Sequence, residues 1–318
     1  MNGWETVPCA GCGSASAAPW LALPCADAPG GSSAVVTCDR CGLKRLDPRP
    51  GPQALSRYYE AAGQRGYNAF QGRRRDARRQ ALWEWIRDGA AHPCGRRHGW
   101  VPFRGALARW AFVINLDLRG RKGWSILEVG AGYGDLLKYW KDRGCEVLGT
   151  DLGPQASEAA GNLGLDVRVG TLSDLALPHR SFDAAVLCHS LEDLADPNCE
   201  LAELARLLKP GGMLHIAVPN GQAVRFQVQG PSFMHLSFPL HFWFFDPANL
   251  ESISRKHGFS LAGPMRTTTR HHALAHWLEQ CVSGPRWKAT QEFWTFLRLS
   301  LVQPHGGDVL RVQAVRDG

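Results

Sequence analysis

The chain has 318 residues, 44% of them hydrophobic, so it is long enough for one large domain or several smaller ones and can bury a core. This composition excludes a disordered or fibrous protein. The 36 basic and 29 acidic residues are unevenly spread: residues 1–122 hold 19 basic and 9 acidic side chains, a balance of +10, whereas residues 123–318 hold 17 and 20, a balance of −3. This step in charge predicts a domain boundary near residue 123.

No apolar run approaches the roughly 18–20 residues that would span a bilayer, and the longest candidate, residues 103–118, is interrupted by Arg104, Arg109 and Asp117. The first residues also lack the charged and apolar regions of a signal peptide. We therefore expect a cytoplasmic protein with no membrane partner. In such a compartment, clustered cysteines predict a metal site before they predict disulfides.

Two matching cysteine pairs lie near the N-terminus, and each is followed by a glycine. Cys9 and Cys12 form the first pair, Cys38 and Cys41 form the second, and 25 residues separate the pairs. This spacing is typical of a zinc ribbon with four thiolate ligands and no open coordination position, which predicts a structural zinc. Cys25 lies between the pairs without a partner at ligand spacing, so we expect it to be free.

The stretch from residue 48 to residue 122 carries most of the positive charge, interleaved with tryptophans. Two interpretations remain open. Arginines beside aromatic side chains could bind a nucleic acid. Alternatively, the arginines could be the solvated face of helices that connect two domains, and the frequency of such faces favours this second interpretation.

From residue 124 the pattern changes to alternating strands and helices. The segment 125–129 predicts a buried strand, and it ends in a turn with Gly130, Gly132 and Gly134 before a helix. Glu128 lies two residues before the first glycine. Asp151 ends the next predicted strand, where a carboxylate can accept hydrogen bonds from both hydroxyls of a ribose. The glycine spacing differs from the GxGxxG that binds a pyrophosphate, which points to a nucleoside ligand without phosphates.

These residues resemble the first motif, E-x-G-x-G-x-G, of the class I S-adenosylmethionine-dependent methyltransferases. The resemblance continues through residues 167–175, residues 181–189, the L-E-D-x-x-D-P start of a helix at 191–197 and the L-K-P-G-G turn at 208–212. It implies S-adenosylmethionine as cofactor and a mostly parallel, Rossmann-like α/β sheet with an antiparallel last strand at residues 307–316. It also implies four further cofactor-binding residues: Leu152, Thr171, Leu172 and Cys188.

Together with the cysteine pairs, the chain resembles bacterial methyltransferases that carry an N-terminal zinc-binding segment. We therefore expect a zinc ribbon over residues 1–47, a helical connector or cap over 48–122, and a methyltransferase domain over 123–318 with a cap insertion at about 221–247.

Methyl transfer from a sulfonium is an in-line displacement, so the protein must align the acceptor atom and remove its proton where the acceptor is neutral. Two histidines are candidates for this task. His189 directly follows the fourth expected strand, and His241 ends a segment that resembles the family's G-x-x-W-x-x-L-x-x-P-x-H, with Phe233 in place of Trp. Either histidine could be a base or a positioning residue. Asp193 replaces a histidine found in many relatives, which could change the proton or metal chemistry nearby.

An aromatic cluster at residues 242–245, with Phe226, fits either an apolar acceptor pocket or ordinary core. We expect methyl transfer to a small molecule, such as a saccharide or a specialised-metabolite intermediate. The alternative is an RNA methyltransferase that binds nucleic acid through the zinc ribbon and the arginine stretch.

Overall fold

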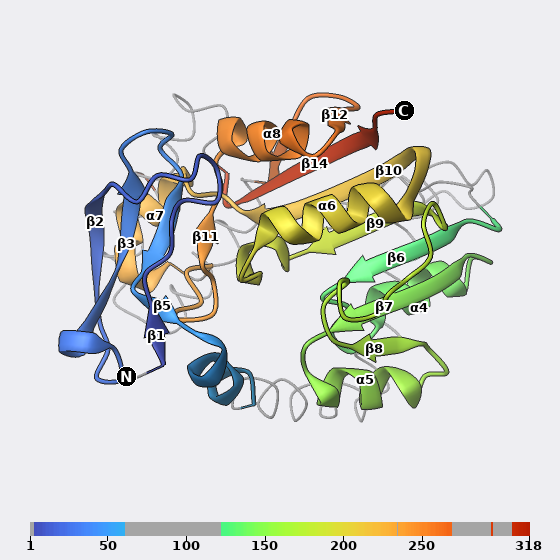
Figure 1. Cartoon of the computed structure of the whole chain (residues 1–318), viewed down its shortest axis with the longest axis horizontal. Coiled ribbons are helices and arrows are strands. Elements are labelled where there is room, and N and C mark those ends of the chain that lie inside the picture. The colour runs from blue at the N-terminus through green and yellow to red at the C-terminus, as the bar shows by residue number, and fades with distance from the viewer. Residues whose placement is uncertain (1–2, 61–121, 234, 269–293, 295–306) are drawn as a thin grey trace.

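The computed structural model describes residues 3–60, 122–233, 235–268, 294 and 307–318. Two sheets dominate these residues, and they lie side by side (Figure 1). A small N-terminal sheet stands opposite the ends of the strands of a larger sheet. No helix among the described residues is long and apolar enough to cross a membrane. The arginine-rich stretch of residues 61–121 lies outside the described residues.

The larger sheet has the strand order β12-β14-β10-β9-β6-β7-β8, with β13 also paired to β14. The strands from β10 to β8 are parallel, and β14 runs antiparallel between β10 and β12. This arrangement confirms the predicted α/β class and the antiparallel last strand. The strands are β6 (Ser125–Val129), β7 (Glu146–Asp151), β8 (Val167–Val169), β9 (Phe182–Cys188), β10 (Leu208–Pro219), β12 (Phe259–Leu261), β13 (Arg266–Thr268) and β14 (Val309–Arg316).

Helices cover the sheet because its central strands are apolar on both faces. Ile126 packs with Trp140 in one core, whereas the adjacent Leu127 packs with Leu204 in the other. Aspartates cap two of the helices: Asp196 accepts hydrogen bonds at the start of α6, and Asp246 does so at α8. The helices are α4 (Asp135–Lys141), α5 (Pro154–Gly161), α6 (Pro197–Leu207), α7 (Val224–Gln229) and α8 (Pro247–Lys256), and the 3₁₀ turns are η1 (Pro29–Gly31), η2 (Leu191–Asp193) and η3 (Gly230–Ser232).

The N-terminal sheet has the order β11-β4-β3-β2 and takes one strand from far along the chain. Its strands are β2 (Ala17–Pro24), β3 (Ser32–Cys38), β4 (Lys44–Asp47) and β11 (Trp243–Phe244), while β1 (Trp4–Glu5) pairs separately with β5 (Arg49–Pro50). The β2–β3 hairpin accounts for the long gap between the cysteine pairs. A helical segment at residues 52–60 follows β5.

The aromatic cluster belongs to the core and not to an acceptor pocket. Phe226 and residues 242–245 are each at most 2% exposed, and they join the core of the larger sheet to that of the N-terminal sheet. Arg49 lies over the rings of Phe242 and Trp243, which adds cation–π contacts to this junction. The region predicted as a cap insertion thus holds the two sheets together.

Candidate active site

The glycine turn after β6 adopts a backbone that other residues enter only with strain. Gly130, Gly132 and Gly134 all have positive φ, at 74°, 53° and 80°. A Cβ on Gly130 would lie 2.5 Å from Cβ of Ser190, whereas a Cβ on Gly132 would meet no atom within 4 Å. Position 130 therefore requires glycine because of both the close approach to Ser190 and the positive φ. Position 132 requires glycine because of the positive φ alone.

Asp151 is held at the end of β7 by two backbone N–H groups. Its Oδ2 accepts a hydrogen bond from Gly132 N at 2.9 Å, and its Oδ1 accepts one from Gly153 N at 2.7 Å. A carboxylate oxygen has more than one acceptor position, so both oxygens can still accept a hydroxyl from a ligand. The glycine turn thus orients the acidic side chain that the sequence predicts to bind ribose.

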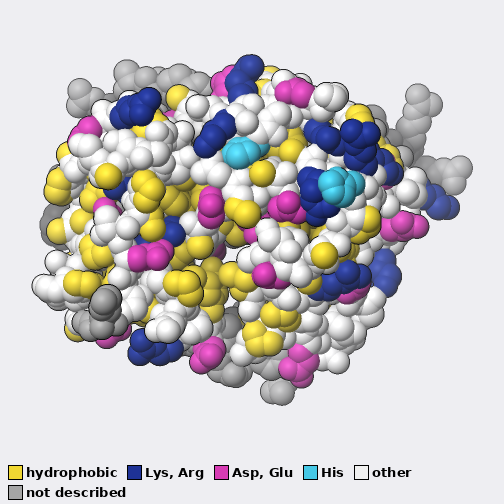
Figure 2. All heavy atoms as spheres, viewed as in Figure 1, with side chains coloured by type: hydrophobic (Ala, Val, Ile, Leu, Met, Phe, Trp, Pro, Cys, Tyr) yellow, Lys and Arg dark blue, Asp and Glu magenta, His cyan; other side chains and the backbone are white. Residues whose placement is uncertain are grey.

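A cavity of about 380 Å³ opens at the carboxyl ends of β6, β7, β8 and β9. Figure 2 shows a hollow with hydrophobic side chains between the two sheets on this side of the molecule. A ligand site in this position is the rule for open α/β sheets. The lining residues are Leu55, Tyr59, Val129, Gly130, Thr150, Asp151, Leu152, Gly170, Thr171, Ser173, His189, Ser190, Asp193, Leu194, Ala195, Asp196, Cys199 and Glu200.

Four of the residues predicted to bind the cofactor line this cavity: Gly130, Asp151, Leu152 and Thr171. Leu152 is 43% exposed, which leaves an apolar surface that a flat ring could cover. The remaining five, Glu128, Gly132, Gly134, Leu172 and Cys188, are not among the lining residues.

Leu172 illustrates the difference between sequence position and side-chain direction. It is fully buried in the core, and its neighbours Thr171 and Ser173 face the cavity. Thr171 donates from both its N–H and its hydroxyl to Asp174 Oδ2, and this hydroxyl bond lowers the pKa of the exposed Asp174 carboxyl. Hydrogen bonds among its own residues thus stabilise the loop after β8.

Glu128 lies behind the cavity wall. Burial, and then the negative charges of Asp135 and Asp151, raise the pKa of its carboxyl well above the ordinary value. Cys188 is partly buried, and this burial raises the pKa of its thiol to about 12. The Glu128 carboxyl accepts a hydrogen bond from the backbone N–H of Leu137 in α4, the helix that follows the glycine turn.

The two candidate histidines lie near two neighbouring carboxylates. His189 lines the cavity directly after β9, has φ of +56°, and places Nδ1 3.3 Å from Glu192 Oε1. His241 is buried, has His235 O 2.8 Å from its Nδ1, and places Nε2 3.5 Å from Asp193 Oδ1. Only His189 lines the cavity, and His241 reaches it through Asp193.

Two cavity residues that sequence reasoning missed come from the N-terminal segment. Leu55 and Tyr59 belong to the helical residues 52–60 and face strand ends at least 70 residues away in the chain. Burial, followed by the charges of Asp193 and Asp151, raises the pKa of Tyr59, so its phenol stays protonated. No local sequence pattern at residues 55–59 indicates where these side chains lie.

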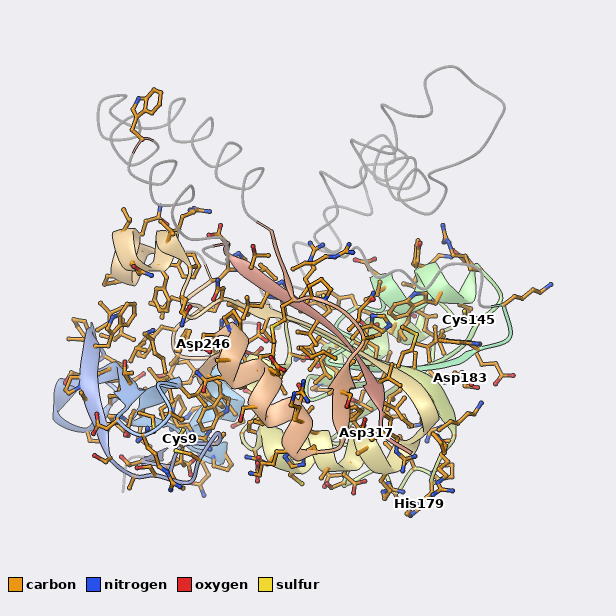
Figure 3. The ribbon with its side chains drawn as sticks, turned by 90° about the horizontal axis from the view of Figure 1, so that it is seen from above. Cys9, Cys145, His179, Asp183, Asp246 and Asp317 are labelled. Atoms are coloured by element: carbon orange, nitrogen blue, oxygen red, sulfur yellow. The ribbon has the colours of Figure 1, made fainter. Side chains whose placement is uncertain are left out.

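The four predicted metal ligands come together in the N-terminal segment. The sulfur atoms of Cys9, Cys12, Cys38 and Cys41 all lie within 4.8 Å of one another. In the view of Figure 3, Cys9 lies in this segment, on the other side of the molecule from Asp183 of β9 and from Cys145, which precedes β7. A tetrahedral zinc with bonds of about 2.3 Å requires sulfur atoms roughly 3.8 Å apart, so the four thiols fit a zinc ion.

The two cysteine pairs form matching turns. Gly13 N donates to Cys9 O, Gly42 N donates to Cys38 O, and both glycines have φ of +76°. These glycines therefore allow the chain to turn tightly after each cysteine pair.

Comparison with known proteins agrees with this geometry. Residues 127–216 match the model of a methyltransferase domain family. The ubiquinone biosynthesis O-methyltransferase of Xanthomonas oryzae pv. oryzae is 38% identical over 112 residues, which cover 33% of this chain and 46% of that protein. The demethylmenaquinone methyltransferase of Thermus thermophilus is 39% identical over 121 residues, 35% of this chain and 54% of that protein.

The chain spans about half the length of the curated relatives it matches. Among solved structures, an S-adenosylmethionine-dependent methyltransferase from Mesorhizobium loti is 18% identical and aligns over 61% of this chain and 92% of its own, with a TM-score of 0.44. The matched domain and the strand order show that this chain carries a methyltransferase domain with a Rossmann-like α/β sheet, next to a four-cysteine cluster in the N-terminal segment.

Proposed function

We propose that the protein transfers a methyl group from S-adenosylmethionine to a small-molecule acceptor. The observation that carries this proposal is the cavity at the carboxyl ends of four parallel strands, where the glycine turn and Asp151 converge. The match of residues 127–216 to a methyltransferase domain supports it.

The cavity offers suitable groups for each part of the cofactor. Asp151 would accept the ribose hydroxyls, Gly130 would allow close approach of the ligand to the backbone, and Leu152 with Thr171 would flank the adenine. Bound there, the sulfonium supplies an electrophilic methyl group. The protein's own task is then to exclude water, align the acceptor and receive a proton, and His189 is the histidine that lines the cavity.

The acceptor is proposed to be small and without phosphates. Asp151 and Asp196 both line the cavity, and their carboxylates repel the phosphates of RNA. The similar ubiquinone and menaquinone methyltransferases, by their names, act on small molecules. Within this class, we propose a saccharide or a specialised-metabolite intermediate.

Calorimetric titration with S-adenosylmethionine and S-adenosylhomocysteine tests the cofactor. Asp151→Ala should weaken both affinities at least tenfold, because a charge-assisted hydrogen bond contributes about 1.5–3 kcal/mol. Asp166→Ala is the matched control, since Asp166 is exposed and pairs only locally with Arg168. Equal binding by the two variants would exclude this cavity as the cofactor site.

Methyl-labelled cofactor with a panel of acceptors tests the substrate class. The panel should hold phenolic quinol precursors, neutral saccharides and total RNA. We expect label in a small molecule and none in RNA. Label in RNA that falls steeply as salt is raised would favour the RNA alternative.

We also propose that the cysteine cluster binds one structural zinc ion. Four cysteines leave no open position for substrate, and the fit of their sulfur atoms supports this assignment. X-ray absorption on the purified protein should show four Zn–S distances of about 2.3 Å. A fully metallated preparation without these distances would exclude the site.

A further inference from the structure

Two histidine–carboxyl contacts meet at the turn η2, and their chemistry differs. His189 Nδ1 lies 3.3 Å from Glu192 Oε1, and His241 Nε2 lies 3.5 Å from Asp193 Oδ1. Glu192 and Asp193 are adjacent in the chain, so one turn fixes both contacts. The two histidines thus contact their carboxyl groups through different ring nitrogens.

The proton on His241 is fixed by its backbone partner. His235 O lies 2.8 Å from Nδ1, and a carbonyl oxygen can only accept, so Nδ1 carries the hydrogen. A neutral His241 then turns the lone pair of Nε2 toward Asp193 Oδ1. Unless a proton lies between these two atoms, their lone pairs repel.

Burial decides which group carries that proton. It raises the pKa of Asp193 well above its usual range, and the charges of Glu192 and then Asp151 add to this effect. It also lowers the pKa of His241, against the opposing effect of Glu192. A neutral His241 facing a protonated Asp193 satisfies both trends. The other titratable groups facing this pair are the phenol of Tyr59 and the ring of His189.

His189 has the geometry of a group that receives a proton from a ligand. Its Nδ1 faces Glu192, which leaves Nε2 as the other ring nitrogen, and the side chain is 30% exposed in the cavity. Its ring stacks on that of His235 with a centroid distance of 5.7 Å. The positive φ of a non-glycine residue is a strained conformation that folds retain most often at functional sites.

We propose that His189 is the catalytic base, that Glu192 positions it through Nδ1, and that His241 is a positioning residue that keeps Asp193 protonated. This assignment rests on the proposed methyl transfer. In the step, Nε2 of His189 takes the proton of the acceptor as the acceptor atom bonds to the methyl carbon. The electron pair of the breaking carbon–sulfur bond stays on sulfur, which leaves S-adenosylhomocysteine and an imidazolium.

Nitrogen NMR of the full-length protein, labelled with ¹⁵N-histidine and recorded with and without S-adenosylhomocysteine from pH 6 to pH 9, tests the assignment. His189→Asn and His241→Asn identify the two sets of signals. We expect His241 to remain neutral with its hydrogen on Nδ1 over this range, and neutral His189 also to carry its hydrogen on Nδ1. Glu192→Gln should change the ring signals of His189, and Asp193→Asn those of His241.

Protonation of His241 within this range, or a hydrogen on its Nε2, would overturn the assignment. So would a His189 that carries its hydrogen on Nε2. If Glu192→Gln does not fold, the signals of the wild-type protein alone decide the question. Failure to bind S-adenosylhomocysteine would instead count against the proposed function, because the signals of the free protein still report the two proton positions.

Discussion

The N-terminal segment and the larger sheet reach a stable structure by different means. The strand β2 is largely exposed, and the N-terminal segment turns twice around sulfur atoms at glycines with positive φ. The larger sheet instead has apolar strands with cores on both faces. We expect a segment with so little core of its own to depend on the proposed zinc ion, whereas the sheet depends on buried apolar area.

The two regions nevertheless share one wall of the cavity. The N–H of Leu46 in β4 donates to Phe242 O, and the N–H of Phe242 donates to Glu192 O, both at 2.8 Å. Trp243 Nε1 donates to Leu194 O of the cavity lining. The N-terminal sheet is thereby connected through two hydrogen bonds to the turn that positions His189 and Asp193, so its loss should alter the cavity while leaving the parallel strands folded.

The largest effect should follow the loss of one metal ligand. Cys38→Ser removes a thiolate from a site of the kind that contributes roughly 10–16 kcal/mol to the folding of small zinc domains. We expect loss of zinc and unfolding of residues 3–50, with the larger sheet retained. Elemental analysis and hydrogen exchange followed by mass spectrometry measure the two parts separately.

Cys25→Ser is the control for this experiment, because Cys25 lies outside the cluster. It should keep one zinc per chain. If Cys38→Ser left hydrogen exchange in residues 3–50 unchanged, the N-terminal segment would not depend on a metal and the contrast between the regions would be wrong.

A glycine-turn variant tests the other region. Gly130→Ala combines a left-handed backbone, which costs roughly 1–2 kcal/mol, with a 2.5 Å approach to Ser190, and such overpacking costs about 1–3 kcal/mol. We expect a loss of about 2–5 kcal/mol in the free energy of unfolding of the larger sheet and a matching loss of cofactor affinity. Urea denaturation and calorimetry measure both.

Gly132→Ala separates the two causes, since its Cβ would enter open space and only the backbone cost of roughly 1–2 kcal/mol remains. Equal losses in the two variants would show that the contact with Ser190 has no part in the effect.

Local spacing explains why much of the site could be predicted from sequence. Cysteines three residues apart and glycines two apart act through the turn in which they lie, so the cluster of Cys9 and Cys38 and the turn at Gly130 follow from short segments. The pattern of strands and helices likewise predicted the class of the larger sheet.

The remainder depends on contacts between distant segments. Tyr59 reaches the cavity only because the helix at 52–60 follows the N-terminal sheet, and that sheet is held in place by β11. The sequence also does not determine the direction of the Leu172 side chain. Leu172 is buried in the core, whereas the adjacent Thr171 lines the cavity. Burial, which raises the pKa of Asp193 and lowers that of His241, is a property of the whole fold.

The raised pKa of Glu200, a cavity residue in α6, should make the stability of the fold depend on pH. Burial raises its pKa from 4.5 to about 7, and Glu203 contributes a smaller increase. As the pH rises from about 4.5 to about 7, the unfolded chain releases this proton while the folded chain retains it, so the free energy of unfolding falls. The Glu200→Gln variant has no carboxyl group that titrates at this position. Its stability relative to the wild type should increase by about 1–2 kcal/mol from about pH 4.5 to about pH 8, because a pKa difference of one corresponds to about 1.4 kcal/mol and solvent reaches part of the group.

Urea denaturation at several pH values measures this difference. A constant difference between the two proteins across the range would mean that Glu200 has an ordinary acidity in the fold.

The smallest expected effect tests the contact between the cysteine turn and the cavity wall directly. Asn198, in the first turn of α6, donates from Nδ2 to Ala10 O at 3.0 Å, between Cys9 and Cys12, and its Oδ1 accepts from Lys256 in α8. Asn198→Ala should cost about 1 kcal/mol and speed amide exchange in residues 9–13 roughly fivefold, since about 1.4 kcal/mol corresponds to tenfold. Asn162→Ala, at an exposed position after α5, should leave this exchange unchanged. If Asn198→Ala also leaves it unchanged while zinc stays bound, the contact of Asn198 with Ala10 does not order the cysteine turn.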